Sequence, residues 1–389
     1  MTNSSSIGNL SIDFDLPLLR TISFELENPE NVTRAGIRLF VDPTLGLLRS
    51  SVSKHTEAIL LRDYEAGSLL GVPMGDLGIG ESYLNEYLQK IFALDPSRVL
   101  EVAAGNGRAA EALSQRGIST IGIDPNLKST PSSKQTDILT LVRGFFPQQM
   151  PKDQLQFDLV CSHAFLEHVD DPVSMLREMA RWCQPGGSIL AAVPDCSESI
   201  RRGDCSMLIH EHRSYFTPQS LFNFAIRAGL TAIQVTQSEY GGVLYMVAKS
   251  PTDEISKDAS VIGEVRKDEC AGVWSSEQLL LSFALNRNRV SQRIAEFDRG
   301  GGLRLIYVPH RLINYIEGII DSIPIDDAMF CQGATVVGFR HQVRSLDQIG
   351  SRPEAILLGS HTFEHALRDR IQRRWDGVRI VTLRELLES

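Results

Sequence analysis

Cysteine is scarce in this chain and absent from its first 160 residues. The six cysteines begin at Cys161, and no two of them form a C-x-x-C pair. A zinc module built from cysteine is therefore excluded before Cys161, because such modules need closely spaced thiolate ligands. A chain of 389 residues buries enough surface to fold without disulfide bonds, so we expect the cysteines to be free thiols.

Long apolar runs and an excess of positive charge are also missing. No apolar stretch approaches the ~20 residues that span a bilayer. The N-terminal sequence MTNSSSIGNLSIDFD lacks a basic region followed by an apolar run. The net charge of -9 argues against a broad surface for nucleic acid or for an anionic membrane. We therefore expect a cytoplasmic protein that binds neither nucleic acid nor a membrane.

Length and patterning divide the chain into four parts. A prior of roughly 150 residues per domain suggests two or three domains. We expect a lead-in without a sustained apolar period at residues 1–74, an α/β domain at 75–250, a polar linker with a long amphipathic helix at 251–299, and a second, smaller α/β domain at 300–389.

Strand-like and helix-like segments alternate in both α/β parts. In the first, strands are predicted at 98–102, 118–123, 139–146, 157–161 and 188–193, and helices at 81–94, 106–116, 173–183 and 217–229. In the second, strands are predicted at 303–308, 355–358 and 378–383, and helices at 313–320 and 365–375. Strands that alternate with helices imply a mostly parallel sheet covered on both faces.

The segment EVAAGNGRAA contains a glycine loop between a strand and a helix. The chain must turn sharply at Gly105 and Gly107, where the missing Cβ atoms let a ligand touch the backbone at a helix N-terminus. Asp124 ends the next strand, where a carboxylate can accept both hydroxyl groups of an adenosine ribose. The spacing Gly105-x-Gly107-x-x-Ala110 also fits a dinucleotide loop, so this motif alone leaves nicotinamide and S-adenosylmethionine open.

Two further segments, FDLVCSHAFLEHVDDP and QPGGSILAAVP, resemble the region after the fourth strand of class I methyltransferases. With EVAAGNG and IGIDP, the resemblance spans about residues 99–193 and implies a Rossmann-like domain that binds S-adenosylmethionine. It implies that Glu101, Gly105 and Gly107 face the methionine end of the cofactor, with Ala103 in the same cofactor-binding loop. It also implies that Asp124 faces the ribose, and that Ser162 and His163 lie at the mouth through which the methyl group is transferred.

Two aromatic residues end the predicted strand at 139–146. Either Phe145 or Phe146 is a candidate to pack on the adenine of the cofactor. Packing in the protein core is an equal alternative for each of them.

The stretch LIHEHRSYFTPQSLFNFAIRAGL resembles a narrower family, the sugar C-methyltransferases that act on nucleotide-linked 4-keto-deoxysugars. The matching pairs are Glu211-His212, Tyr215-Phe216, Ser220-Leu221 and Gly241-Gly242. The pattern SLDQI…RPEAILLGSHTF suits the small C-terminal α/β domain of that family. The resemblance covers roughly residues 80–385 and implies a small-molecule substrate linked to a nucleotide.

The triplet His210-Glu211-His212 holds the catalytic candidates. A carbon next to a ketone becomes a nucleophile once its proton is removed, and a histidine suits that task when a carboxylate orients it. We expect His212 to be the base and Glu211 to orient it in an irregular loop, while His210 could replace either. We expect His168 in the LEH sequence to be structural. A metal site needs a third ligand at suitable spacing, and the sequence shows none, so it does not indicate a metal site.

This chain departs from the narrower family at three places. It has no N-terminal cysteine-rich zinc module, and Ile209 stands where a tyrosine commonly precedes the triplet. The glycine loop of the family's C-terminal domain is replaced by YVPHRLIN, which disfavours tight pyrophosphate binding there, although His310 and Arg311 could meet a phosphate. These departures concern the acceptor side and leave the methyl-donor loop intact.

The sequence therefore predicts an α/β protein with a Rossmann-like methyltransferase domain and a second, smaller C-terminal α/β domain. It would transfer a methyl group from S-adenosylmethionine to a small molecule, preferably to carbon of a nucleotide-linked keto sugar. The alternatives are methylation of oxygen or nitrogen in another metabolite, a non-catalytic scaffold that binds cofactor or nucleotide sugar, and a nicotinamide oxidoreductase. The acceptor and the oligomeric state stay open.

Overall fold

The computed structural model of the chain describes residues 10–18, 33–42, 45–65, 79–127, 138–150, 156–252 and 276–388. Most of the predicted polar linker, together with Cys270, lies outside the described residues. The other five cysteines are buried and free. Within the described ranges, no helix combines the length and the apolar character that crossing a membrane requires.

The first α/β domain is built on a seven-stranded sheet with the strand order β10-β11-β8-β7-β4-β5-β6. The strands are β4 (Arg98–Val102), β5 (Ser119–Asp124), β6 (Leu139–Arg143), β7 (Phe157–His163), β8 (Cys183–Pro194), β10 (Thr231–Gln237) and β11 (Val243–Lys249). Neighbouring strands are parallel from β8 to β6, whereas β11 is antiparallel to both β8 and β10. The chain leaves β4 on one side and returns to β7 on the other, which creates a topological switch point between them.

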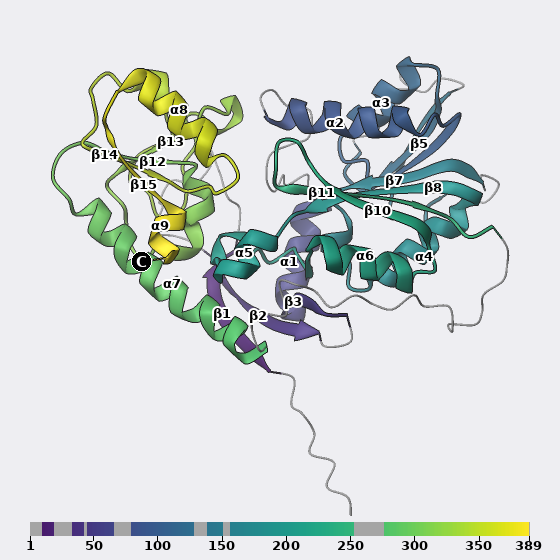
Figure 1. The fold of residues 1–389 in the computed structure, drawn as a ribbon, viewed down its shortest axis with the longest axis horizontal. Coiled ribbons are helices and arrows are strands. Elements are labelled where there is room, and N and C mark those ends of the chain that lie inside the picture. The colour runs from purple at the N-terminus through teal and green to yellow at the C-terminus, as the bar shows by residue number, and fades with distance from the viewer. Residues whose placement is uncertain are drawn as a thin grey trace, which may run out of the picture.

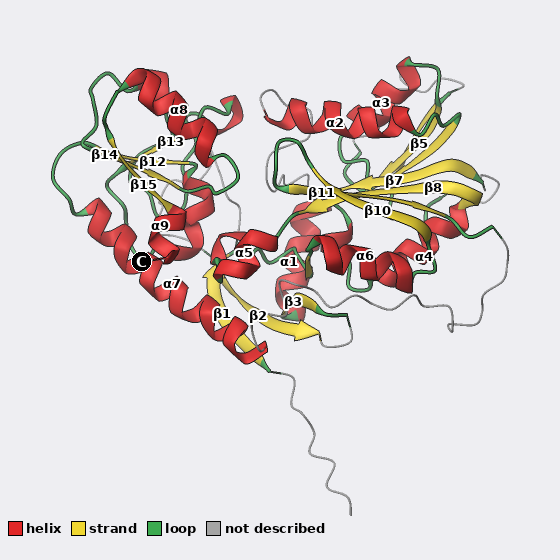
Figure 2. Cartoon of the chain, in the orientation of Figure 1, coloured by secondary structure: helices red, strands yellow, loops and turns green. Residues whose placement is uncertain are grey.

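Helices cover both faces of this sheet. α2 (Ile79–Ala93) and α3 (Arg108–Gln115) lie on one face, and α4 (Pro172–Trp182) and α6 (Pro218–Arg227) lie on the other (Figure 2). α4 and α6 begin at the predicted caps, because the side chains of Asp171 and Thr217 each accept a backbone hydrogen bond from the first helical turn. The predicted mostly parallel sheet with two covered faces is therefore confirmed.

The N-terminal part, expected to be a poorly defined lead-in, instead forms an antiparallel sheet. Its strands β1 (Ser11–Pro17), β2 (Arg34–Asp42) and β3 (Leu47–Val52) are followed by α1 (Lys54–Glu65), and β3 pairs with β9 (Ser214–Tyr215) of the first α/β domain. Buried and exposed residues do alternate, as at Ile37 and Leu39 in β2. Each strand buries so few side chains that no sustained period arises, which is why the sequence did not indicate the sheet.

The C-terminal domain has a four-stranded parallel sheet in the order β13-β12-β14-β15. The strands are β12 (Arg304–Tyr307), β13 (Ile323–Ile325), β14 (Ala355–Leu358) and β15 (Arg379–Thr382), with the helices α8 (Glu364–Arg374) and α9 (Leu383–Glu388). The helix predicted at 313–320 is wrong. The chain forms a 3-10 helix, η3 (Pro309–Tyr315), and Ile316 is already extended, because side chains of η3 bond to the first α/β domain.

α7 (Ser276–Asp298) is part of the core and connects three parts of the molecule. Its buried residues, among them Phe283 and Ile294, belong to one hydrophobic cluster with Leu16 and Ile37 of the N-terminal sheet and Leu357 of the C-terminal sheet. Figure 1 shows this helix running below the C-terminal domain toward β1. The predicted long helix is present, and it packs the N-terminal sheet against the C-terminal domain.

A buried polar network joins the C-terminal domain to the first α/β domain. The carboxylate of Asp204, between α5 (Ser197–Arg202) and η2 (Cys205–Met207), is fully buried and accepts hydrogen bonds from Tyr315 Oη at 2.5 Å and His361 Nε2 at 2.8 Å. The Cys205 amide donates to Tyr315 Oη at 2.6 Å. Burial raises the pKa of Asp204, but the His361 hydrogen bond and charge outweigh it and hold that pKa at about 2.

Replacing Tyr315 by phenylalanine tests how much this network stabilises the molecule. Tyr315→Phe leaves an oxygen of Asp204 and the Cys205 amide without their shared partner, which costs about 1–3 kcal/mol for a buried polar group. We expect a lower urea midpoint for unfolding. Tyr240→Phe, which removes a hydroxyl from a side chain that is 43% exposed, should leave the midpoint unchanged. Equal midpoints for the two variants would contradict a stabilising network.

Candidate active site

The glycine loop lies at the carboxyl end of β4, beside the switch point of the seven-stranded sheet. Ala103, Gly105 and Gly107 all have positive φ, at 57°, 56° and 81°, and α3 begins immediately after Gly107. A Cβ atom placed on Gly105 would meet no heavy atom within 4 Å. The loop therefore combines a left-handed backbone with open space above it, which is the arrangement a ligand needs to approach the main chain.

Glu101, in β4 below this loop, has a buried carboxylate with spare hydrogen-bonding capacity. The side chain is 1% exposed, the Ala110 amide at the start of α3 donates to it, and Oε2 has no partner among the described residues. Burial, helped by the nearby Asp124, raises its pKa to about 8. A buried acceptor without a donor is costly, so this oxygen fits a ligand that brings a positively charged amine.

Asp124 ends β5 and lies directly against the loop, as the sequence predicts. Its Oδ2 accepts the Gly105 amide at 2.9 Å and its Oδ1 accepts the Asn126 amide at 2.7 Å. These two bonds fix the glycine loop against the end of β5.

The structure distinguishes the two candidate aromatic residues after β6. Phe146 is 7% exposed and packs against the Trp182 ring in the core at a centroid distance of 6.0 Å. Phe145 is 41% exposed. Only Phe145 therefore offers a ring face to a ligand.

Ser162 and His163 end β7 next to the glycine loop in the sheet. The hydroxyl of Ser162 and the Nε2 of His163 are buried and have no partner among the residues that the structure describes. The His163 ring packs edge-on against Tyr87 at 5.3 Å, and burial lowers its pKa to about 4. Both side chains are therefore neutral polar groups that can serve a ligand at this edge.

The structure gives the two histidines of the predicted triplet different surroundings. His210 is 1% exposed, and its Nε2 is 2.9 Å from the carbonyl oxygen of Ala35 in β2. His212 is half-buried, its carbonyl accepts a hydrogen bond from Ser50 Oγ, and its ring has no hydrogen bond to any described residue. The N-terminal sheet thus anchors the triplet, and His212 is the histidine left with an available ring.

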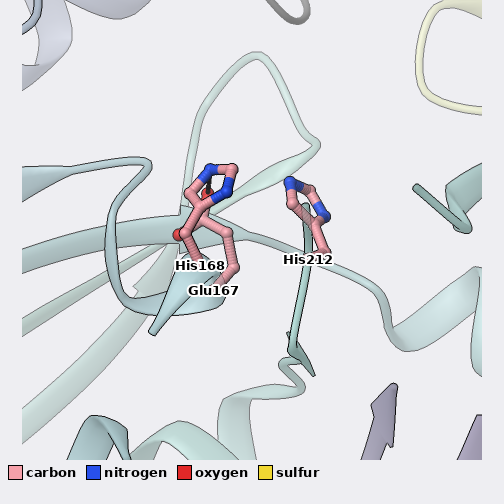
Figure 3. Close-up of side chains that lie close together, drawn as sticks. All are labelled: Glu167, His168 and His212. Carbon is pink, nitrogen blue, oxygen red and sulfur yellow. Dashed lines mark ion pairs between the residues drawn. The ribbon is translucent and has the colours of Figure 1, made fainter. Parts of the chain in front are cut away.

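His168, expected to be structural, lies beside His212. The two rings meet edge to face at a centroid distance of 4.9 Å (Figure 3). His168 Nδ1 is 3.2 Å from the carbonyl oxygen of Glu211, which can only accept, so the proton lies on Nδ1 and Nε2 keeps a lone pair. Burial lowers the pKa of His168 to about 4, so this ring is neutral.

A buried carboxylate that the sequence analysis did not single out completes the group. Glu167, in η1 (Leu166–His168) after β7, is 1% exposed; neither carboxylate oxygen has a side-chain hydrogen-bond partner among the described residues, and Oε1 lies 3.9 Å from His168 Nε2. Burial raises its pKa to about 8. The orienting carboxylate is expected at Glu211, whose carbonyl oxygen lies near His168 Nδ1; Glu167 is a second carboxylate, and it is grouped with the two histidines.

The sequence indicated no metal site, whereas the fold brings three possible ligands together. One ligand atom each from Glu167, His168 and His212 lies within 4.8 Å of the others. Two histidines and a carboxylate are a donor set that divalent metals accept. The set was not apparent in the sequence because His212 lies far along the chain from the LEH segment. The LEH segment and the segment that carries His212 both occupy loops at the same edge of the sheet. That shared position was the feature from which their proximity could have been predicted.

The electrostatic surroundings keep His212 neutral. Burial, and then the proximity of His168 and of Arg311 in η3, lower its pKa well below the usual range. The neutral ring has the lone pair that a general base needs, and its lowered pKa makes it a weaker proton acceptor than an ordinary histidine. The Arg213 amide, which donates to the carbonyl oxygen of Glu167 at 2.6 Å, holds the loop carrying His212 against η1.

Comparison with known proteins places this arrangement among methyltransferases. A family model described as a methyltransferase domain matches residues 79–235. The ubiquinone biosynthesis O-methyltransferase of Pseudomonas fluorescens (strain SBW25) is 27% identical over 161 residues, which are 37% of this chain and 68% of that protein. The C-methyltransferase NovU of Streptomyces niveus is 23% identical over 216 residues, which are 55% of this chain and 51% of NovU.

A solved structure gives a weaker likeness. The 1,6-didemethyltoxoflavin-N1-methyltransferase of Burkholderia thailandensis, with bound 1,6-didemethyltoxoflavin and S-adenosylhomocysteine, has a TM-score of 0.39 at 17% identity and covers 56% of this chain and 96% of that one. The family match instead coincides with the α/β domain that carries the glycine loop and Asp124. This chain therefore has a class I methyltransferase domain, and it is a methyltransferase that uses S-adenosylmethionine.

Proposed function

We propose that this methyltransferase methylates the carbon next to the ketone of a nucleotide-linked keto-deoxysugar, with His212 as the general base. The observation that carries the proposal is the neutral ring of His212 beside His168 and Glu167, next to the strand end that carries Ser162 and His163. The similarity to NovU, a C-methyltransferase by name, supports transfer to carbon.

The donor side follows from the glycine loop and its neighbours. S-adenosylmethionine supplies a methyl group on a positively charged sulfur. In this proposal Glu101 binds the ammonium of its methionine part, the backbone from Ala103 to Gly107 lies against it, Asp124 binds the ribose, and Phe145 packs on the adenine. Ser162 and His163 bound the mouth through which the methyl group passes. The orphaned oxygen of Glu101 and the open space at Gly105 fit this ligand.

On the acceptor side, a proton must be removed from the carbon next to the ketone, and that carbon must be aligned with the methyl group. His212 takes the proton from the carbon next to the ketone, and the electron pair of that C–H bond forms the new bond to the methyl carbon. The bond between methyl and sulfur breaks, and its electron pair stays on sulfur. His168, fixed by the Glu211 carbonyl, packs on the His212 ring and sets its orientation, so the chain contributes alignment and a base.

Methylation of oxygen is a second candidate because of the similarity to ubiquinone biosynthesis O-methyltransferases. In that case His212 would take the proton of a hydroxyl group, and the ketone would not be needed. Incubation with 13C-methyl-labelled cofactor distinguishes the two, because methyl groups on carbon and on oxygen give separate NMR resonances. Cofactor binding without turnover of any acceptor would favour the non-catalytic scaffold instead.

Filling the space at Gly105 tests the donor site. We expect Gly105→Val to abolish binding of S-adenosylhomocysteine in isothermal titration, because the new side chain occupies the space where the ligand meets the backbone. Gly117→Val is the matched control, since Gly117 also has a positive φ with no atom near its Cβ position but follows the far end of α3. Tight binding by Gly105→Val would place the cofactor elsewhere.

The raised pKa of Glu101 predicts a pH dependence of cofactor binding. Without ligand, Glu101 is mainly protonated below its pKa of about 8, and it must lose that proton to pair with an ammonium group. Affinity for S-adenosylhomocysteine should therefore rise between pH 6 and pH 8, by up to about tenfold per pH unit. Titrations in buffers of different ionisation enthalpy should detect the released proton.

Glu101→Gln should bind more weakly and lose this pH dependence, while Glu296→Gln, an exposed position on α7, should behave like the unmodified protein. A flat affinity between pH 6 and pH 8 in the unmodified protein would argue against pairing of Glu101 with the ammonium.

Removal of the base tests the acceptor chemistry. His212→Ala should lower turnover of nucleotide-linked 4-keto-deoxysugars roughly 10²–10⁴-fold, as for loss of a general base, and leave S-adenosylhomocysteine affinity nearly unchanged. His365→Ala, at a side chain that is 92% exposed on α8, is the control. An active His212→Ala enzyme would show that another group takes the proton.

A further inference from the structure

Three side chains at the proposed base offer lone pairs to one point in space. One ligand atom each from Glu167, His168 and His212 lies within 4.8 Å of the others. The carboxylate of Glu167 is 1% exposed and has no side-chain hydrogen-bond partner among the described residues. A buried acceptor in this state lowers stability until a ligand supplies the missing partner. The cluster thus combines a set of possible ligand atoms with a buried carboxylate that lacks a donor.

His168 is held in the tautomer that leaves its other ring nitrogen available. Its Nδ1 lies 3.2 Å from the carbonyl oxygen of Glu211 and therefore carries the proton. Histidines that bind metals usually donate their second nitrogen to such an oxygen, which fixes the ring and its tautomer. His168 Nε2 lies 3.9 Å from Glu167 Oε1, which is too far for a hydrogen bond. An ion with bonds of about 2 Å to each of these two atoms fits between them.

His212 faces this pair from a separate segment of the chain (Figure 3). Its ring meets the His168 ring edge to face at a centroid distance of 4.9 Å, and no hydrogen bond to a described residue prevents it from turning toward an ion. The main chain around it is fixed, because the Arg213 amide donates to the Glu167 carbonyl oxygen at 2.6 Å. A fixed backbone with a ring that can turn suits a third metal ligand.

Nearby positive charges decide which ions this cluster can take. The guanidinium of Arg213 pairs with Glu57 at 3.2 Å and with Asp170 at 3.4 Å, which offsets its charge. Arg311 is exposed, so solvent and salt screen its charge. Glu167, once ionised, supplies a single negative charge. An ion that binds imidazole strongly, such as Zn²⁺, is therefore favoured over Mg²⁺ or Ca²⁺, which need several oxygen ligands.

We propose that Glu167, His168 and His212 bind a divalent ion of the zinc class, and that the bound ion switches the enzyme off by occupying the lone pair of His212. Two imidazoles and one carboxylate are sufficient to hold zinc in proteins. A metal ion and a proton compete for the same lone pair. The inhibitory effect rests on the proposed function, in which His212 takes the proton of the acceptor, whereas the binding site does not.

Metal binding can be measured without the acceptor. Zn²⁺ is titrated by calorimetry, and Co²⁺ by its visible d–d bands, into the full-length protein saturated with S-adenosylhomocysteine. We expect one ion per chain. Glu167→Gln and His168→Asn should each weaken binding about 100-fold or more, because loss of a residue that merely orients a ligand already costs about 10–100-fold. His365→Asn is the matched control, since it removes one member of the exposed pair of His365 and Asp369.

Three results would overturn the metal site. They are absence of Zn²⁺ binding, equal affinity in Glu167→Gln and the unmodified protein, and a thiolate-to-cobalt charge-transfer band, which would place the ion at a cysteine. Binding of S-adenosylhomocysteine reports whether each variant is folded. If His168→Asn fails that check, Glu167→Gln decides the question, because glutamine keeps the shape of the side chain.

Turnover tests the inhibitory effect. Zn²⁺ should inhibit methylation of nucleotide-linked 4-keto-deoxysugars over the concentration range in which it binds, and a chelator should restore the activity. Glu167→Gln should need about 100-fold more Zn²⁺ for the same fractional loss. Full activity with Zn²⁺ bound would overturn the inhibitory effect. Absence of turnover before Zn²⁺ is added would contradict the proposed acceptor, and the binding titration would still decide the metal site.

Discussion

On the acceptor side of the proposed site, the position of His212 depends on the pairing of β3 with β9. β9 begins two residues after His212, and the short ladder joins Leu48 and Arg49 to Tyr215 and Ser214. Around it, the N-terminal sheet bonds to His210 and to the His212 carbonyl, and η1 bonds to the neighbouring Arg213 amide. A loop held from several elements gives His212 a fixed position, although the loop itself is irregular. The N-terminal sheet thus supplies support in a region where the resembling family has a zinc module.

Two buried carboxylates lie in the two halves of the proposed active site. Glu101 and Glu167 each have an unpartnered oxygen among the described residues, and burial raises the pKa of each to about 8. Both are therefore mainly neutral near pH 7, which avoids a buried unpaired charge. A polar group kept without a partner lowers stability, so its retention indicates a site where a ligand supplies the missing interaction.

Local patterns made the glycine loop and its contact with Asp124 predictable, and long-range contacts decided the rest. β4, the glycine loop and Asp124 lie within about one β-α-β unit, where spacing alone gives the geometry. The sequence could not tell which of Phe145 and Phe146 faces a ligand, because the side chains of these adjacent residues differ only in the direction that the backbone gives them. The grouping of Glu167 and His168 with His212, and the N-terminal sheet itself, arise from tertiary contacts that no short pattern encodes. The helix expected at 313–320 failed for the same reason, since buried bonds to Asp204 and Cys205 override helical propensity.

The bond from Ser50 to the His212 carbonyl joins residues 162 positions apart. Closing so long a loop costs chain entropy before any contact forms, while the strands around the glycine loop meet after short connections. The strands around the glycine loop therefore close short loops, whereas the position of His212 depends on contacts that close a long one.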